Sequence, residues 1–143
     1  MAAGGVDFQL VVMGESFRAT PPIFTEARTR LAGRIIHFGY AASPAEYSAW
    51  LKRGDVVVST ATHEFFGIAV VEAVRAGCRP LLPNRLAYPE LFSGEYLYGP
   101  GELAWRLAVA LQAGRLPDGE VRELTARFSW SVLLDQYCAW LGS

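Results

Sequence analysis

The sequence contains little cysteine, little histidine and no cluster of positive charge. Two cysteines, Cys78 and Cys138, provide neither a disulfide framework nor a group of metal ligands, which fits a reducing cytosol. A net charge of −1 without a dense Lys/Arg run gives the chain no evident nucleic-acid surface. No apolar run approaches membrane-spanning length, and residues 1–5 lack the features of a signal peptide. We therefore expect a cytoplasmic protein that needs no metal.

The residues that are present indicate a folded α/β domain. A chain of 143 residues with 52% hydrophobic and 19% charged residues is long and apolar enough to bury a core. Segments of strand and helix character alternate, which predicts a Rossmann-like, doubly wound parallel sheet. The expected strands are 8–13, 34–38, 55–59, 79–82 and 96–98. The expected helices are 23–31, 43–54, one that opens near residues 64–67 and closes at Gly77, 101–113, 119–128 and 129–141, with a helical turn at 89–92. The first strand is followed by neither a dinucleotide-binding glycine motif nor a phosphate-binding Gly/Lys loop.

The stretch from residue 55 to residue 78 organises this pattern. Val56–Val58 form a buried strand, residues 59–63 form a polar loop, and a helix then runs to Gly77, which suits a C-terminal cap. The loop thus brings a helix N-terminus to the carboxyl end of a strand, where α/β proteins bind anionic ligands. The apolar stripe of this helix is expected at Phe65, Ile68, Val71 and Val74.

Two glutamates, Glu64 and Glu72, frame this helix about two turns apart, on roughly one side of it. For an isolated pair, the simplest interpretation is that Glu64 complements the helix dipole and Glu72 is solvated. Here Glu72 lies within an apolar run, and Glu64 belongs to the segment His-Glu-Phe-Phe-Gly that follows a strand of valines. This setting favours a binding role for both carboxylates.

The segment 64–72 resembles the glutamate, seven residues, glutamate motif of retaining GT-B glycosyltransferases, in particular glycosyltransferase family 4. The form Ser-Thr-Ala-Thr-His-Glu-Phe-Phe-Gly, with Tyr88-Pro-Glu further on, is similar to the tRNA-queuosine mannosyltransferases. Segments 13–17, 37–40, 95–98 and 128–130 extend this likeness over roughly residues 8 to 130. The usual Pro-Ser before the first glutamate is replaced by residues 59–63.

The resemblance implies roles for the residues of the motif. The carboxylate of Glu72 would accept hydrogen bonds from two ribose hydroxyls of a sugar nucleotide. Glu64 would face hydroxyls of the donor sugar and serve catalysis. The backbone N–H groups of Phe66, Gly67 and Ile68 would hold the diphosphate, and Gly67 permits a close approach.

Four other residues are candidates for the donor site, and each has a second interpretation. His63 is expected either to contact the phosphate or to be a packed loop residue. Tyr40 either flanks the base or is a core aromatic. Arg18, after the first strand, either meets a phosphate or faces solvent, and Glu90 either lines the pocket or begins a helix. An apolar stripe near the C-terminus is expected to be core or a contact with another domain: Trp130, Leu133, Tyr137 and Trp140.

By this resemblance, residues 1–143 form a single C-terminal, nucleotide-sugar-binding domain, and the N-terminal acceptor domain is absent. The implied donor is GDP-mannose and the implied acceptor is queuosine in tRNA, reached through the missing domain. The enzyme would be a hexosyltransferase without a cofactor, and this portion alone is expected to be inactive. Two alternatives stay open, namely a related glycosyltransferase that uses another UDP- or GDP-sugar for glycan synthesis, and a nucleotide-binding module without catalysis.

Overall fold

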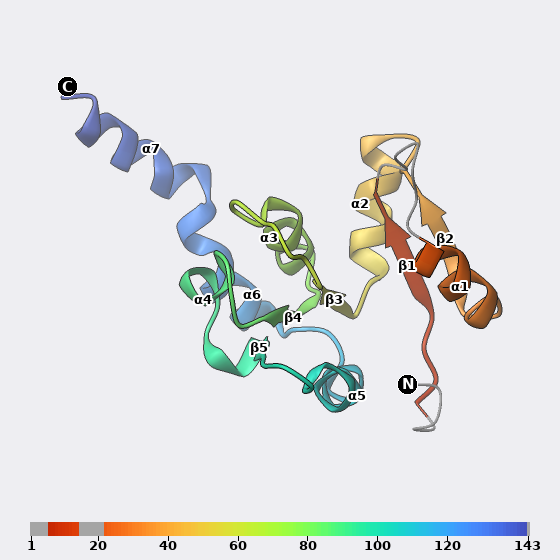
Figure 1. Ribbon diagram of the computed structural model, residues 1–143. Coiled ribbons are helices and arrows are strands. Elements are labelled where there is room, and N and C mark those ends of the chain that lie inside the picture. The colour runs from red at the N-terminus through yellow and green to blue at the C-terminus, as the bar shows by residue number, and fades with distance from the viewer. Residues whose placement is uncertain (1–5, 15–21, 143) are drawn as a thin grey trace. The chain divides into compact units, whose positions relative to one another are not determined.

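The computed structural model describes residues 6–14 and 22–142 and has the expected α/β class (Figure 1). Its strands pair in parallel and are flanked by helices, consistent with a Rossmann-like domain. The chain divides into two compact units, Met1–Trp50 and Leu51–Ser143. A two-stranded sheet lies in the first unit and a three-stranded sheet in the second.

Unit 1 is built on two parallel strands. Its elements are β1 (Leu10–Met13), α1 (Pro22–Arg30), β2 (Ile35–Gly39) and most of α2 (Pro44–Arg53). The carboxyl ends of the strands are tied together, because the N–H of Gly14 donates to the carbonyl of Gly39 at 3.1 Å. Ser43 begins α2 as predicted, since its hydroxyl accepts the N–H of Glu46 at 3.1 Å.

Unit 2 has the strand order β3-β4-β5, all parallel. Its elements are β3 (Val56–Val58), α3 (Ile68–Arg75), β4 (Arg79–Pro83), α4 (Tyr88–Leu91), the 3₁₀ turn η2 (Gly94–Tyr96), β5 (Leu97–Tyr98), α5 (Leu103–Ala113), α6 (Asp118–Thr125), the 3₁₀ turn η3 (Ala126–Phe128) and α7 (Trp130–Trp140). The predicted helix 119–128 is therefore an α-helix that tightens into a 3₁₀ turn, and the strand predicted at 96–98 begins one residue later.

The core of unit 2 lies between α3 and the strand β4. Val74, Leu82 and Tyr88 are completely buried and share one cluster. The other buried members of this cluster are Val70, Phe92, Tyr96, Leu97 and Leu116. Such a continuous apolar cluster packs α3 against the sheet.

The end of α3 confirms the predicted glycine cap. Gly77 adopts a φ of +104°, and its N–H donates to the carbonyl of Val74 at 2.9 Å, while the N–H of Cys78 donates to that of Ala73 at 2.9 Å. These two bonds form a Schellman motif, which explains why glycine stands at this position. Cys78 follows directly and is 3% exposed, as expected for a small core residue.

None of the described helices combines the length and the hydropathy that a membrane crossing requires.

Candidate functional site

The loop between β3 and α3 is anchored at its first residue, Ser59. Its N–H donates to the carbonyl of Leu81 at 3.1 Å, and its own carbonyl accepts the hydroxyl of Tyr98 at 2.8 Å. Two residues further on, the carbonyl of Ala61 accepts the guanidinium of Arg85 at 2.9 Å. The loop that was predicted from its polar composition is therefore attached to β4, to β5 and to the segment that follows β4.

Glu64 closes this loop onto the start of α3. Its Oε1 accepts the N–H groups of Phe65 at 3.1 Å and of Gly67 at 3.0 Å. Its Oε2 accepts the hydroxyl of Tyr88 at 3.4 Å. The carboxylate thus lies at the N-terminus of the helix, where the helix dipole favours a negative charge. It is partly exposed, so it remains accessible to a ligand.

Both the backbone conformation at position 67 and the close approach of Tyr88 require a glycine there. Its φ of +80° lies in the left-handed region, and a Cβ at this position would lie 3.2 Å from Cε1 of Tyr88. Its carbonyl accepts the N–H groups of Val70 and Val71, which starts the helix. Its own N–H, which was expected to hold a diphosphate, donates to Glu64. A ligand that uses this N–H must therefore displace the carboxylate.

The helix α3 begins at Ile68, just after residues 64–67, near which it was expected to open. Val70, Ala73 and Val74 are buried, whereas Phe65 is 99% and Ile68 is 62% exposed. The predicted stripe is therefore wrong at its first two positions. Phe65 precedes the helix and does not follow its periodicity, and Ile68 is exposed as the first residue of the helix.

The expected placement of the two glutamates on one side of a helix is likewise wrong. Glu64 precedes α3, so the helical spacing does not relate it to Glu72. Glu72 lies in the second half of the helix and is exposed, despite its apolar neighbours in the sequence. Its proposed contact with ribose stays a prediction.

The weaker candidates are all exposed where the structure describes them. Tyr40 is 77% exposed at the end of β2, so the core alternative is wrong for it. His63 is exposed in the loop, which also argues against a packed histidine, and Glu90 is exposed in α4. Arg18 lies outside the described residues. Tyr40 belongs to unit 1, and His63, Glu64, Gly67 and Glu72 belong to unit 2.

The sequence placed Ser59 and Tyr88 in motifs but indicated no role for either, although Ser59 begins the loop that carries Glu64 and Tyr88 contacts this loop. The hydroxyl of Tyr88 lies 2.8 Å from Oγ of Ser59, and Tyr88 is completely buried. Burial raises the pKa of Tyr88, an effect that the Ser59 hydrogen bond opposes and the nearby Glu64 carboxylate reinforces. The available signal was a tyrosine beside a proline after a buried strand, which does not reveal a hydrogen-bond partner 29 residues away.

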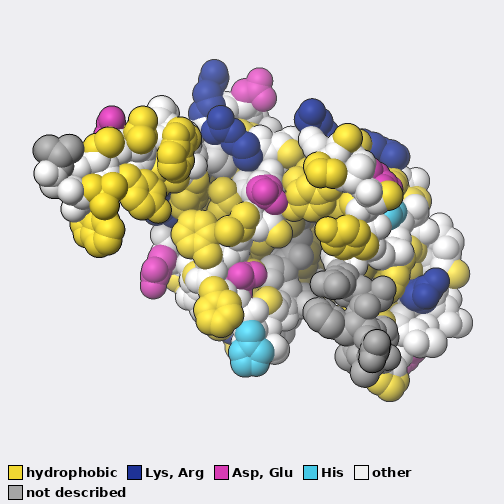
Figure 2. All heavy atoms as spheres, turned by 90° about the horizontal axis from the view of Figure 1, so that it is seen from above, with side chains coloured by type: hydrophobic (Ala, Val, Ile, Leu, Met, Phe, Trp, Pro, Cys, Tyr) yellow, Lys and Arg dark blue, Asp and Glu magenta, His cyan; other side chains and the backbone are white. Residues whose placement is uncertain are grey.

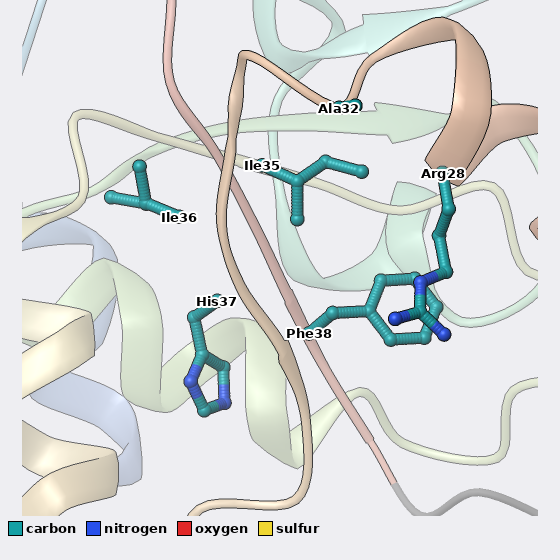
Figure 3. A pocket seen from close by; sticks show the side chains of 6 residues that line it. All are labelled: Arg28, Ala32, Ile35, Ile36, His37 and Phe38. Atoms are coloured by element: carbon teal, nitrogen blue, oxygen red, sulfur yellow. The ribbon is translucent and has the colours of Figure 1, made fainter.

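A cavity of about 400 Å³ lies in unit 1 (Figure 3). The guanidinium of Arg28 lies over the ring of Phe38, 4.9 Å from its centroid, and the strand β2 contributes most of the lining. Nε2 of His37 is buried and has no hydrogen-bond partner among the described residues. Of the residues expected to bind the donor, none that the structure describes lines this cavity.

The C-terminal helix α7 presents apolar side chains to solvent. It has no buried residue, and Trp130, Tyr137 and Trp140 are 67%, 51% and 82% exposed. Figure 2 shows hydrophobic side chains along the part of the molecule that carries α7. The interpretation of this stripe as core is wrong, and its interpretation as a contact with another domain stays a prediction.

Comparison with known proteins supports the resemblance seen in the motifs. No protein-family model matches the chain. Over 93 residues, or 65% of its length, the chain is 43% identical to a tRNA-queuosine alpha-mannosyltransferase from Drosophila melanogaster. The predicted similarity to that enzyme is therefore confirmed. The matched stretch spans 24% of the length of this relative.

Proposed function

We propose that the chain is the nucleotide-sugar-binding portion of a retaining glycosyltransferase, which transfers mannose from GDP-mannose to queuosine in tRNA. The observation that carries this proposal is the 43% identity over 93 residues to a tRNA-queuosine alpha-mannosyltransferase. The match spans about a quarter of that relative, and the proposal places the acceptor site in another portion of such an enzyme. The expected cytoplasmic location and the absence of a required metal form part of the proposal.

The local geometry of unit 2 is compatible with donor binding. The loop after β3 ends at Gly67, and α3 follows with its N-terminal N–H groups. Among the described residues, no acceptor pairs with the N–H groups of Phe66 or Ile68, which are thus suited to phosphate oxygens. Such preorganised donors would stabilise the charge that develops on the leaving diphosphate.

In this proposal, the two carboxylates bind different parts of the donor. Glu64 faces the sugar, and Glu72 accepts hydrogen bonds from the ribose hydroxyls, where a carboxylate binds two neighbouring donors well. Glu64 is already held by three hydrogen bonds, so the orientation of its carboxylate is set before the sugar arrives. Glu72 is exposed and thus accessible to a nucleotide.

Calorimetric titration of the chain with GDP, UDP and ADP tests the proposal. We expect weak binding with a preference for GDP, because a ligand held by one wall of a cleft stays partly solvated. Glu72→Ala should weaken the binding of all three nucleotides, because they share the ribose, and Glu123→Ala is a matched control, since Glu123 is an exposed helical glutamate of α6. A preference for UDP or ADP would reject GDP-mannose as the donor, and no binding of any nucleotide would reject the function.

A further inference from the structure

A series of hydrogen bonds connects Ser59, at the start of the loop after β3, with Glu64, near the end of this loop, through the buried hydroxyl of Tyr88. The N–H of Ala61 donates to Oγ of Ser59 at 3.2 Å. Oγ of Ser59 lies 2.8 Å from the hydroxyl of Tyr88, which in turn donates to Oε2 of Glu64 at 3.4 Å. Tyr88 of α4 therefore connects two side chains of this loop, those of Ser59 and Glu64.

The direction of each hydrogen bond between Ser59, Tyr88 and Glu64 can be assigned in one way only. An ionised carboxylate accepts hydrogen bonds and donates none, so the single proton of Tyr88 points to Glu64. The Ser59 hydroxyl must then donate to the oxygen of Tyr88 while it accepts the N–H of Ala61. Burial raises the pKa of Tyr88, which keeps this hydroxyl protonated and able to donate.

The ring of Tyr88 is held in place by close packing. It is completely buried, and its Cε1 lies against the backbone of Gly67, where a Cβ would be only 3.2 Å away. The carbonyl of Ser59 is fixed by the hydroxyl of Tyr98 at 2.8 Å. Neither the ring nor the serine can therefore move freely, so the Tyr88 hydroxyl is a rigid donor.

We infer that Tyr88 is a positioning residue that orients the carboxylate of Glu64 toward the donor sugar. This inference rests on the proposed function. A carboxylate has about four acceptor positions, and in Glu64 Phe65 and Gly67 fill two of them on Oε1 while Tyr88 fills one on Oε2. One position on Oε2 is left, so Glu64 accepts a hydrogen bond from a single hydroxyl of the sugar.

Tyr88→Phe tests this role with Tyr96→Phe as a matched control. Tyr96 is also a buried tyrosine of unit 2, and its hydroxyl donates to a different carboxylate, that of Glu120, at 3.1 Å. Calorimetry with GDP and GDP-mannose separates the contribution of the sugar from that of the nucleotide. We expect Tyr88→Phe to weaken GDP-mannose binding about tenfold and GDP binding less than about twofold, because one hydrogen bond to a charged group is disturbed. Tyr96→Phe should leave both affinities unchanged.

Amide hydrogen exchange at Gly67, followed by NMR, provides a readout that needs no ligand. Its N–H donates to Glu64, so a loosened carboxylate should speed its exchange in Tyr88→Phe but not in Tyr96→Phe. If Tyr88→Phe does not fold, Ser59→Ala replaces it, because it removes the donor to Tyr88 from a partly exposed position.

The outcomes separate the positioning role from the proposed function. Unchanged exchange at Gly67 would overturn the positioning of Glu64, and equal losses for GDP and GDP-mannose would overturn its orientation toward the sugar. If the unaltered chain binds neither ligand, the proposed function fails, and the exchange rate alone decides whether Tyr88 fixes Glu64.

Discussion

Replacement of Gly67 by alanine tests the conformation on which the candidate site depends. The φ of +80° at Gly67 places any other residue in the left-handed region, at a cost of about 1–2 kcal/mol. The new Cβ would also lie 3.2 Å from Cε1 of Tyr88 and 3.6 Å from Cδ1 of Leu91. Tyr88 is completely buried, so it has no free space into which it can move.

We expect Gly67→Ala to lower the free energy of unfolding by roughly 2–4 kcal/mol, from strain and overpacking together. Urea titration followed by circular dichroism measures this change. Gly119→Ala is the control, because Gly119 lies in α6 with no atom within 4 Å of an added Cβ and no positive φ. There alanine should raise the free energy of unfolding by about 0.4–1 kcal/mol. Equal effects of the two substitutions would refute the assigned conformation of Gly67.

Three further predictions concern individual side chains. Glu72→Ala should make the free energy of GDP binding about 1.5–3 kcal/mol less favourable, as measured by calorimetry. Circular dichroism should show that the chain remains folded. Unchanged affinity would mean that Glu72 is only a solvated residue. Glu64→Gln keeps one acceptor oxygen for the N–H groups of the loop. Calorimetry should therefore show a GDP affinity within about twofold of that of the unaltered chain and a GDP-mannose affinity reduced about tenfold. Equal losses for both ligands would contradict the placement of the sugar. Burial, together with the hydrogen bond to Glu120, raises the pKa of Tyr96 to about 12 from the ordinary 10.0, so the unfolded chain loses this proton first as the pH rises. The free energy of unfolding should therefore fall between pH 10.0 and about 12, and urea titrations across this range should show a smaller fall for Tyr96→Phe.

The order and type of the elements could be predicted from the sequence because the hydrophobic periodicity agrees with the positions of the residues that begin and end helices. Gly77 ends a helix and Ser43 begins one for local reasons, namely a left-handed backbone and a side-chain cap. Local signals of this kind need no knowledge of distant contacts, so the predicted boundaries agree with the structure within a few residues.

The contacts of the candidate site could not be predicted in the same way. Glu64 was assigned to a helix, but its carboxylate accepts the N–H groups that precede the helix, so α3 begins at Ile68. The bond between Tyr88 and Ser59 joins residues 29 positions apart, and no periodicity in the sequence encodes it. The exposure of α7 shows the converse, since its apolar pattern is clear in the sequence while the helix has no buried residue in the structure.

The most direct test of the proposed function is to map GDP-mannose onto the chain by amide chemical shifts in NMR. The donor should perturb the amides of residues 64–72, most strongly Phe66 and Ile68, whose N–H groups are proposed to meet the diphosphate. Perturbations confined to the cavity lined by Arg28 and His37 in unit 1, with residues 64–72 unchanged, would contradict the assignment of the donor site.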